Sequence, residues 1–257
     1  IRVVDCVSPD VLAQKVRDNL SVVNELLACL YEYPPFDADE IIETYLSYGE
    51  RLRPYVGDTS LYLNQAIESG KKILIEGAQG THLDIDHGTY PFVTSSNATA
   101  GGVCSGLGIG PTQIDAVLGV AKAYTTRVGS GPFPSELNND LGEQLRSEGN
   151  EFGATTGRPR RCGSLDAVVL RYSARVNACD SLVLTKLDVL DSLESIPICT
   201  AYQIGNEHRD EMPAETWLLD QVTPVIEEMP GWQTPTSSIK DWANLPQACR
   251  DYVKRVS

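Results

Sequence analysis

The sequence predicts an α/β fold with a largely parallel central sheet flanked by helices and a helical subdomain at the start. Two observations carry this prediction. Apolar residues recur at helical spacing in the first third of the chain, and short apolar runs alternate with helical segments from residue 72 onward. We expect residues 1–71 to form the helical subdomain and residues 72–257 to form the α/β part of the same single domain.

Three helices are expected in the helical subdomain. Ser8 and Pro9 combine an N-cap with proline at the first helical position, and apolar residues then recur at spacings of three and four. Pro34 and Pro35 end this helix. Asp37 begins a second helix with a pattern like a capping box, and a third covers residues 58–70.

The α/β part opens with residues 73–75, an apolar run too short for a helix that leads into a glycine-rich loop. Such a run predicts a buried strand. The further elements expected are a helix over 113–123, a strand near 124–128, a helix over 166–177, a strand over 182–184, a strand over 196–204 and a closing helix over 245–256.

Composition excludes several classes of protein. The seven cysteines form no CxxC pair and are odd in number, which argues for reduced thiols in the cytoplasm. No run approaches 18 apolar residues and the chain does not begin like a signal peptide, so we expect no membrane partner. The net charge of -14 would repel nucleic acid. The dense basic cluster of Arg158, Arg160 and Arg161 suits a phosphorylated small molecule better.

The glycine-rich segment 76–91 follows the first predicted strand, where α/β proteins bind ligands. A binding role competes with a turn that is rich in glycine for conformational reasons. Its His82, His87, Asp84 and Asp86 could be drawn as a metal site, but carboxylates in loops more often cap turns, and we predict no metal there. The hydroxyl-rich run 94–102 can donate to phosphate, although such runs occur in many loops.

Two later segments carry stronger signals. Residues 153–161 place three arginines in a glycine- and threonine-rich loop, and each guanidinium can donate two hydrogen bonds to a carboxylate or phosphate. A solvated basic loop is the alternative. Thr185-Lys186-Leu187-Asp188 follows an apolar strand and resembles the guanine-reading motif of GTP-binding proteins. A phosphate-binding G-x-x-x-x-G-K-[ST] sequence is absent.

Several motifs in order resemble those of adenylosuccinate synthetases: EGAQGT at 76–81, DIDHGTYP at 84–91, VTSSN at 93–97, GNEFGATTGR at 149–158 and TKLDVLD at 185–191. The resemblance implies a fold like that of the P-loop NTPases and a ligase of purine (AMP) biosynthesis. In that family GTP phosphorylates the 6-oxygen of inosine monophosphate (IMP), and the amine of L-aspartate then displaces the phosphate. It also implies Mg²⁺ and a homodimer.

The resemblance assigns roles residue by residue. Gln79 and Arg158 would be catalytic, and Gln79, Thr94 and Arg158 would bind IMP. Aspartate would be bound by Ala154, Thr155, Thr156, Gly157 and Arg158. GTP would be bound by Arg160, Lys186, Leu187 and Asp188.

The family's phosphate loop, its general base and most of its expected Mg²⁺ ligands have no counterpart in the printed sequence, and neither has its last guanine-contacting residue. We therefore expect a central to C-terminal portion of the synthetase that is inactive alone. A catalytically inactive homologue and a GTP-binding module, such as a GTPase-like switch, are the alternatives.

Overall fold

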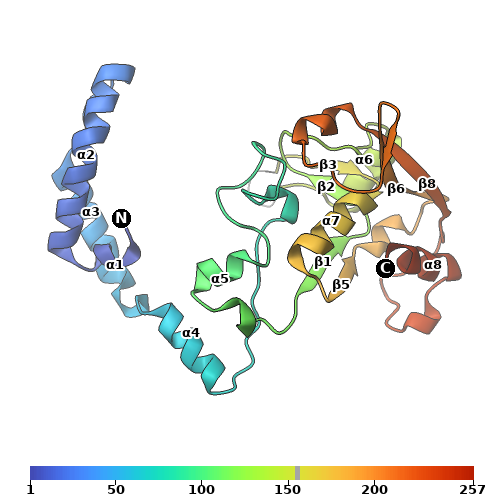
Figure 1. Cartoon of the computed structure of the whole chain (residues 1–257), viewed down its shortest axis with the longest axis horizontal. Helices are drawn as coiled ribbons and strands as arrows, with labels where there is room; N and C mark the ends of the chain where they lie inside the picture. The colour runs from blue at the N-terminus through green and yellow to red at the C-terminus, as the bar shows by residue number, and fades with distance from the viewer. Residues whose placement is uncertain (154–156) are drawn as a thin grey trace. The chain divides into compact units, whose positions relative to one another are not determined.

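The structure is a computed structural model that describes residues 1–153 and 157–257. The chain forms two compact units, Ile1–Gln65 and Ala66–Ser257 (Figure 1). The boundary expected after residue 71 stays a prediction about domains.

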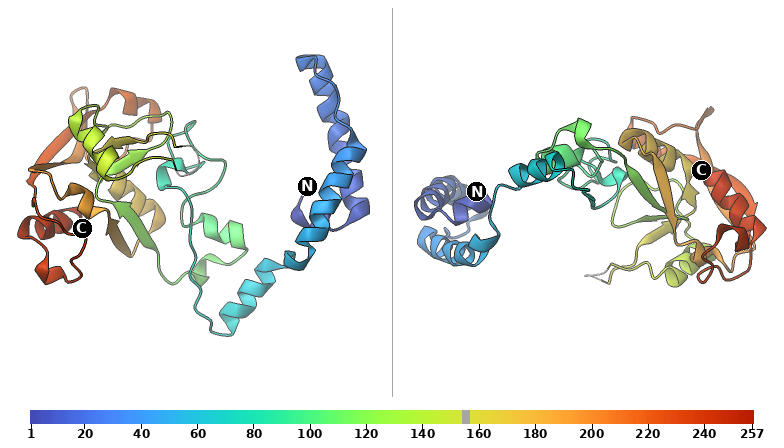
Figure 2. Two further views of the ribbon diagram at one scale, coloured as in Figure 1. Left: turned by 180° about the vertical axis from the view of Figure 1, so that it is seen from behind. Right: turned by 90° about the horizontal axis from the view of Figure 1, so that it is seen from below.

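The first unit is helical, as predicted. Asp37 caps its second long helix by accepting hydrogen bonds from the backbone N–H groups of Asp39, at 2.7 Å, and Glu40. The two long helices pack side by side, with Leu12 and Ile42 in the small core between them (Figures 1 and 2). The helices are α1 Val3–Cys6, α2 Pro9–Tyr31, α3 Ala38–Leu52 and α4 Thr59–Glu68, which reaches into the second unit, with the 3₁₀ turn η1 Arg53–Tyr55.

The second unit mixes strands and helices, which confirms the α/β class. Its strands are β1 Leu118–Lys122, β2 Thr125–Arg127, β3 Arg161–Gly163, β4 Leu165–Asp166, β5 Ser181–Thr185, β6 Ser195–Ile204, β7 Glu207–Arg209 and β8 Thr223–Pro230. Its helices are α5 Gly102–Leu107, α6 Asp140–Glu148, α7 Ala167–Asn177 and α8 Gln247–Val256. Short 3₁₀ helices are η2 Thr81–Leu83, η3 Pro111–Gln113, η4 Leu187–Leu190, η5 Thr216–Gln221 and η6 Trp242–Asn244.

The strand pairings are both parallel and antiparallel. Parallel pairs join β1 to β5 and β4 to β6, and α7 packs against β6 and β1 (Figure 1). Antiparallel pairs join β2 to β3, and β6 to β7 and β8. The loop between β6 and β7 has only the two residues Gly205 and Asn206, and so short a connection forces an antiparallel hairpin.

Most predicted elements of this unit are confirmed, and two are wrong. Where a helix was expected over 113–123, β1 pairs in register with β5, from Leu118 opposite Ser181 onward. Tertiary pairing overrides local helical preference there. Residues 73–75 lie outside the strands of the described chain, and the side chain of Leu74 is 95% exposed. An apolar run becomes a strand only where a partner strand accepts its hydrogen bonds.

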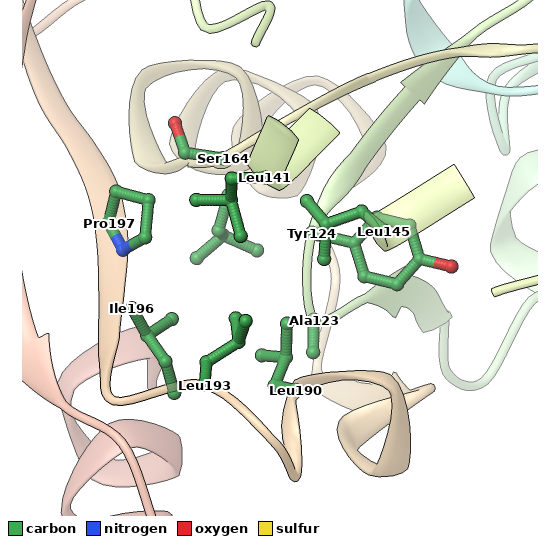
Figure 3. Close-up of a pocket in the computed structure, with 10 residues that line it drawn as sticks. Ala123, Tyr124, Leu141, Leu145, Ser164, Leu190, Leu193, Ile196 and Pro197 are labelled. Carbon is green, nitrogen blue, oxygen red and sulfur yellow. The ribbon is translucent and has the colours of Figure 1, made fainter. Parts of the chain in front are cut away.

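The main core lies where β4, β6, α6 and α8 meet, around Tyr124, Leu145, Ile196 and Tyr252. A cavity of about 10 Å³ remains among these apolar side chains (Figure 3). That volume is about the space of one water molecule, so this cavity belongs to the core and cannot hold a nucleotide. Among the described residues, the structure contains no helix that is both long and apolar enough to span a membrane.

Candidate functional site

The candidate site begins at the carboxyl ends of β1 and β5, where parallel sheets commonly bind ligands. β1 ends at Lys122, which lies opposite Thr185 at the end of β5. Lys186 follows directly in the left-handed backbone region, with φ of 60°, and Asp188 lies exposed in the short helix η4. The predicted guanine motif therefore occupies a turn at the end of a strand, and β1 ends beside it.

A buried carboxylate joins this turn to the arginine loop. Glu151 is 0% exposed, and its Oε1 accepts hydrogen bonds from Tyr124 Oη at 2.5 Å and Lys122 Nζ at 2.7 Å. Its Oε2 accepts from Arg160 Nη1 at 2.7 Å, and Lys186 Nζ lies 3.6 Å from Oε1. We call these five residues the Glu151 cluster. It brings together two residues that the sequence predicted to bind GTP, Arg160 and Lys186.

Electrostatics keep Glu151 charged. Burial alone would raise the pKa of this carboxyl, but hydrogen bonds from Lys122, Tyr124 and Arg160 outweigh burial and lower its pKa to about 2. Burial, followed by the hydrogen bond to Glu151, raises the pKa of Tyr124. Three cations thus surround one carboxylate, which leaves the cluster with a net positive charge that favours a phosphate.

The base of the arginine loop is a narrow hairpin. The backbone N–H of Arg160 donates to the carbonyl oxygen of Glu151 at 2.9 Å, and that of Gly153 donates to Arg158 at 2.8 Å. Gly157 has φ of 65°, and its N–H donates to the carbonyl of Gly153 at 2.8 Å. Arg158 is exposed near the tip. The predicted aspartate-binding residues 154–156 lie outside the described residues.

Gln79 lies on the glycine-rich segment 76–91 and Thr94 begins the hydroxyl-rich run 94–102, and neither contributes to the Glu151 cluster. Gln79 is exposed and has φ of 65°. Thr94 is half-buried, and its backbone N–H donates to the carbonyl of Leu83 at 2.8 Å. Two of the three residues predicted to bind IMP, Gln79 and Thr94, therefore lie outside the arginine loop. That loop carries the third, Arg158, together with Arg160 of the predicted GTP site.

Asp84 organises that loop as the capping carboxylate that the sequence favoured. It is 0% exposed and accepts hydrogen bonds from the backbone N–H groups of Asp86, His87 and Thr99. Burial raises the pKa of Asp84, but these backbone donors outweigh burial and lower it to about 2. In the part of the chain that the structure describes, no group of three or more His, Cys, Asp and Glu side chains could hold a metal ion.

Sequence reasoning missed Glu151, Lys122 and Tyr124. Glu151 lies inside a motif that was recognised, but nothing local marks it as buried. Lys122 and Tyr124 were assigned to different elements, whereas in the structure both donate to the carboxylate of Glu151. The structure shows why residue 149 is a glycine, because a Cβ there would lie 2.2 Å from Tyr124 Oη.

Comparisons with known proteins identify the family of the chain. The family model described as adenylosuccinate synthetase matches residues 1–257. The chain is 54% identical over 256 residues to the adenylosuccinate synthetase of Bifidobacterium adolescentis and 51% identical over 254 residues to that of Thermodesulfovibrio yellowstonii. These matches cover 100% and 99% of the chain, but it spans only 60% of the length of each relative.

A solved structure gives the same result. The fully ligated adenylosuccinate synthetase from Plasmodium falciparum matches with a TM-score of 0.90 at 39% identity, over 100% of this chain and 60% of that one. Family model, relatives and solved structure agree over the full printed chain. The chain therefore belongs to the adenylosuccinate synthetase family.

Proposed function

We propose that the protein to which this chain belongs joins L-aspartate to IMP with the energy of GTP, and releases adenylosuccinate, GDP and phosphate. Family membership supports this activity, although the chain spans 60% of the length of its relatives. The observation that carries the proposal is the Glu151 cluster, which ties the guanine motif to the arginine loop. A single GTP molecule could then bind the guanine motif with its base and the arginine loop with its phosphates.

GTP would be read at the turn after β5. The carboxylate of Asp188 is exposed there and can accept hydrogen bonds from guanine N1–H and the exocyclic amine, two donors that adenine lacks. Lys186 and Leu187 would pack against the base. Arg160 would reach the phosphates, since its guanidinium is 30% exposed and the cluster around it is net positive.

IMP and aspartate would meet on the other loops. Gln79 would contact the 6-oxygen of IMP and Thr94 its phosphate. The γ-phosphoryl group of GTP would move to the 6-oxygen of IMP. The aspartate amine would then attack C6, the carbon that bears this oxygen, and expel phosphate. Arg158 would bind both IMP and aspartate and stabilise negative charge as it develops. Ala154, Thr155, Thr156 and Gly157 would complete the aspartate site.

We also propose that the complete enzyme is a cytoplasmic homodimer that requires Mg²⁺. A magnesium ion bound to GTP would neutralise charge on the phosphates. The described residues offer no metal-binding group of their own, so no residue of this chain is assigned to the ion.

The test is a chimera in which this chain replaces the matching 60% of the Bifidobacterium adolescentis relative. We expect it to form adenylosuccinate only with GTP, IMP and aspartate together, and we expect Arg158→Leu to lower kcat/KM at least about 100-fold through loss of a charged, bidentate contact. Activity is followed by the absorbance change on product formation.

Arg175→Leu is the matched control, because Arg175 is 59% exposed on α7 and pairs with Glu211 on the surface. It should leave activity within about twofold of the parent. A chimera that binds GTP without forming product would contradict the proposal and favour a GTP-binding module. Full activity of Arg158→Leu would contradict the role of the arginine loop.

A further inference from the structure

We propose that Glu151 is a positioning residue that couples the GTP site to the aspartate loop, by holding Lys186 and Arg160 on one buried carboxylate. This inference rests on the proposed function for the roles of those two cations. The carboxylate itself lies behind them and would not touch a substrate.

The two carboxylate oxygens of Glu151 bind different partners. Oε1 is held by Tyr124 at 2.5 Å and Lys122 at 2.7 Å, and Oε2 holds Arg160 at 2.7 Å. Because the side chain is 0% exposed, water cannot take the place of a lost partner. The carboxylate therefore cannot rotate to follow one cation without losing another.

Backbone contacts reinforce the same link. Lys186 Nζ donates to the carbonyl oxygen of Gly149, two residues before Glu151. The carbonyl oxygen of Glu151 accepts from the N–H of Arg160 at 2.9 Å. Asn150, which lies between Gly149 and Glu151, has φ of 48°. Segment 149–151 thus contacts the guanine motif on one side and closes the base of the arginine loop on the other. A shift of Lys186 on nucleotide binding would therefore displace segment 149–151, and with it Arg160.

Lys122 and Tyr124 serve as anchors. Lys122 is the last residue of β1, and Tyr124 directly precedes β2. Lys122 Nζ also donates to Thr126 Oγ1 at 2.9 Å. When a phosphate draws Arg160 outward, Lys122 and Tyr124 stay on Oε1 and keep the charge of Glu151 paired, while Oε2 loses its hydrogen bond from Arg160. The arrangement keeps the charge of Glu151 paired, while a movement of either substrate-facing cation acts on the other through the shared carboxylate.

The negative charge is essential to this geometry. Glutamine has the same shape, but its amide offers a single oxygen and turns an NH₂ donor toward a cation. Glu151→Gln must therefore release either Arg160 or Lys122, because neither cation can accept a hydrogen bond from the amide NH₂. Either loss loosens the joint between the two sites.

The experiment compares Glu151→Gln with Glu136→Gln in the chimera. Glu136 is the matched control, because it pairs with Arg161, the neighbour of Arg160, through two hydrogen bonds of 2.7 and 2.5 Å and its side chain is 18% exposed. We expect Glu151→Gln to raise the KM for GTP and the KM for aspartate at least about tenfold, the usual effect of losing a charged hydrogen bond. The KM for IMP should rise less than these two, because Gln79 and Thr94 would bind IMP outside the arginine loop.

Coupling is read from the KM for aspartate measured at low and at saturating GTP. In the parent this KM should fall as GTP saturates, and in Glu151→Gln it should no longer depend on GTP. Glu136→Gln should keep the dependence of the parent even if its melting temperature falls. A purely structural role for Glu151 would lower the melting temperature and leave this dependence intact.

The inference is overturned if Glu151→Gln raises the two KM values no more than Glu136→Gln does. If Glu151→Gln fails to fold, Tyr124→Phe replaces it, because it removes one donor and keeps the charge and the ring. We then expect the KM values for GTP and aspartate to rise about threefold. Unchanged values would contradict a positioning role for Glu151. An unsubstituted chimera that binds GTP but forms no product would count against the proposed function alone, and the same comparison on the Kd for GTP would still decide on Glu151.

Discussion

His82 is a histidine that the fold keeps neutral. Its ring meets that of Tyr172 edge-on, with centroids 5.7 Å apart, and its Nε2 is buried without a hydrogen-bond partner among the described residues. The residue as a whole is only partly buried, so it is this nitrogen that decides its titration. Burial, followed by the charge of Arg127, lowers the pKa of His82 to about 4.

This lowered pKa predicts a loss of stability in acid. Between pH 6.5 and pH 4 the unfolded chain binds a proton that the native state does not, so the free energy of unfolding falls as the pH falls. The loss should reach about 2 kcal/mol at pH 5. Urea midpoints at pH 7.5 and pH 5 measure this loss in the chimera. His82→Phe should remove the contribution of His82 to the pH dependence of the free energy of unfolding.

The control for this prediction is His208→Gln, because His208 is exposed on β7. It should leave the slope unchanged. The window above pH 5 avoids the carboxyl groups of Glu151 and Asp84, whose stabilising charges are lost only as the pH falls below their ordinary pKa values toward about 2. Equal slopes in the parent and in His82→Phe would contradict the prediction.

Roles of single residues were visible from the sequence to different degrees. Asp37 could be assigned as a helix cap because a cap contacts backbone N–H groups two or three residues ahead. Glu151 could not be assigned, because Lys122 and Lys186, two of its partners, lie 29 and 35 positions away in the chain. Only folding decides that such distant charges meet.

At the scale of elements, the end of α6 determines whether the Glu151 cluster can assemble. α6 ends at Glu148, and Gly149 is its C-cap. A Cβ at Gly149 would lie 2.2 Å from Tyr124 Oη, 2.6 Å from the carbonyl oxygen of Leu145 and 3.1 Å from Glu151 Cγ. We expect Gly149→Ala to cost about 2 kcal/mol of stability, because it overpacks a site that cannot expand. The change should also raise the KM for GTP.

Gly106→Ala is the matched control for the same substitution. Gly106 lies within α5, and a Cβ there meets nothing within 4 Å. It should stabilise the protein by about 0.5–1 kcal/mol, since alanine has the higher helix propensity. Denaturant unfolding of both variants checks the pair, and equal effects would refute the steric argument.

The two incorrect elements share one cause. Residues 113–123 carry a pattern compatible with a helix, and residues 73–75 carry one compatible with a buried strand. β1 forms because β5 lies beside it, whereas residues 73–75 have no strand partner among the described residues. Strand formation depends on a partner elsewhere in the chain, and helix formation does not.

At the scale of the whole molecule, the chain exposes an unusual amount of apolar surface on a parallel pair of strands. On β1, Leu118 is 59% and Val120 71% exposed, and Val183 on β5 is 40% exposed. Parallel sheets are normally covered on both faces. Such a surface promotes association.

We therefore expect the isolated 28.0 kDa chain to elute from a sizing column above its monomer mass at micromolar concentration. Leu118→Thr with Val120→Thr should shift it toward the monomer, because threonine keeps strand propensity and reduces apolar area. Ile226→Thr, which changes a single side chain on β8 that is 40% exposed, is the control. Monomeric elution of the unsubstituted chain at every concentration would contradict the prediction.

The α/β class, the three longer helices α2 to α4, strand β5 and the family all follow from the sequence, because helix caps, apolar periodicity and ordered motifs are local properties of the chain. The tertiary structure decided that residues 118–122 pair as a strand, and that Lys122, Tyr124, Arg160 and Lys186 gather on Glu151. These outcomes depend on contacts between segments distant in the chain. A buried charge is stable only where its partners arrive from such segments together.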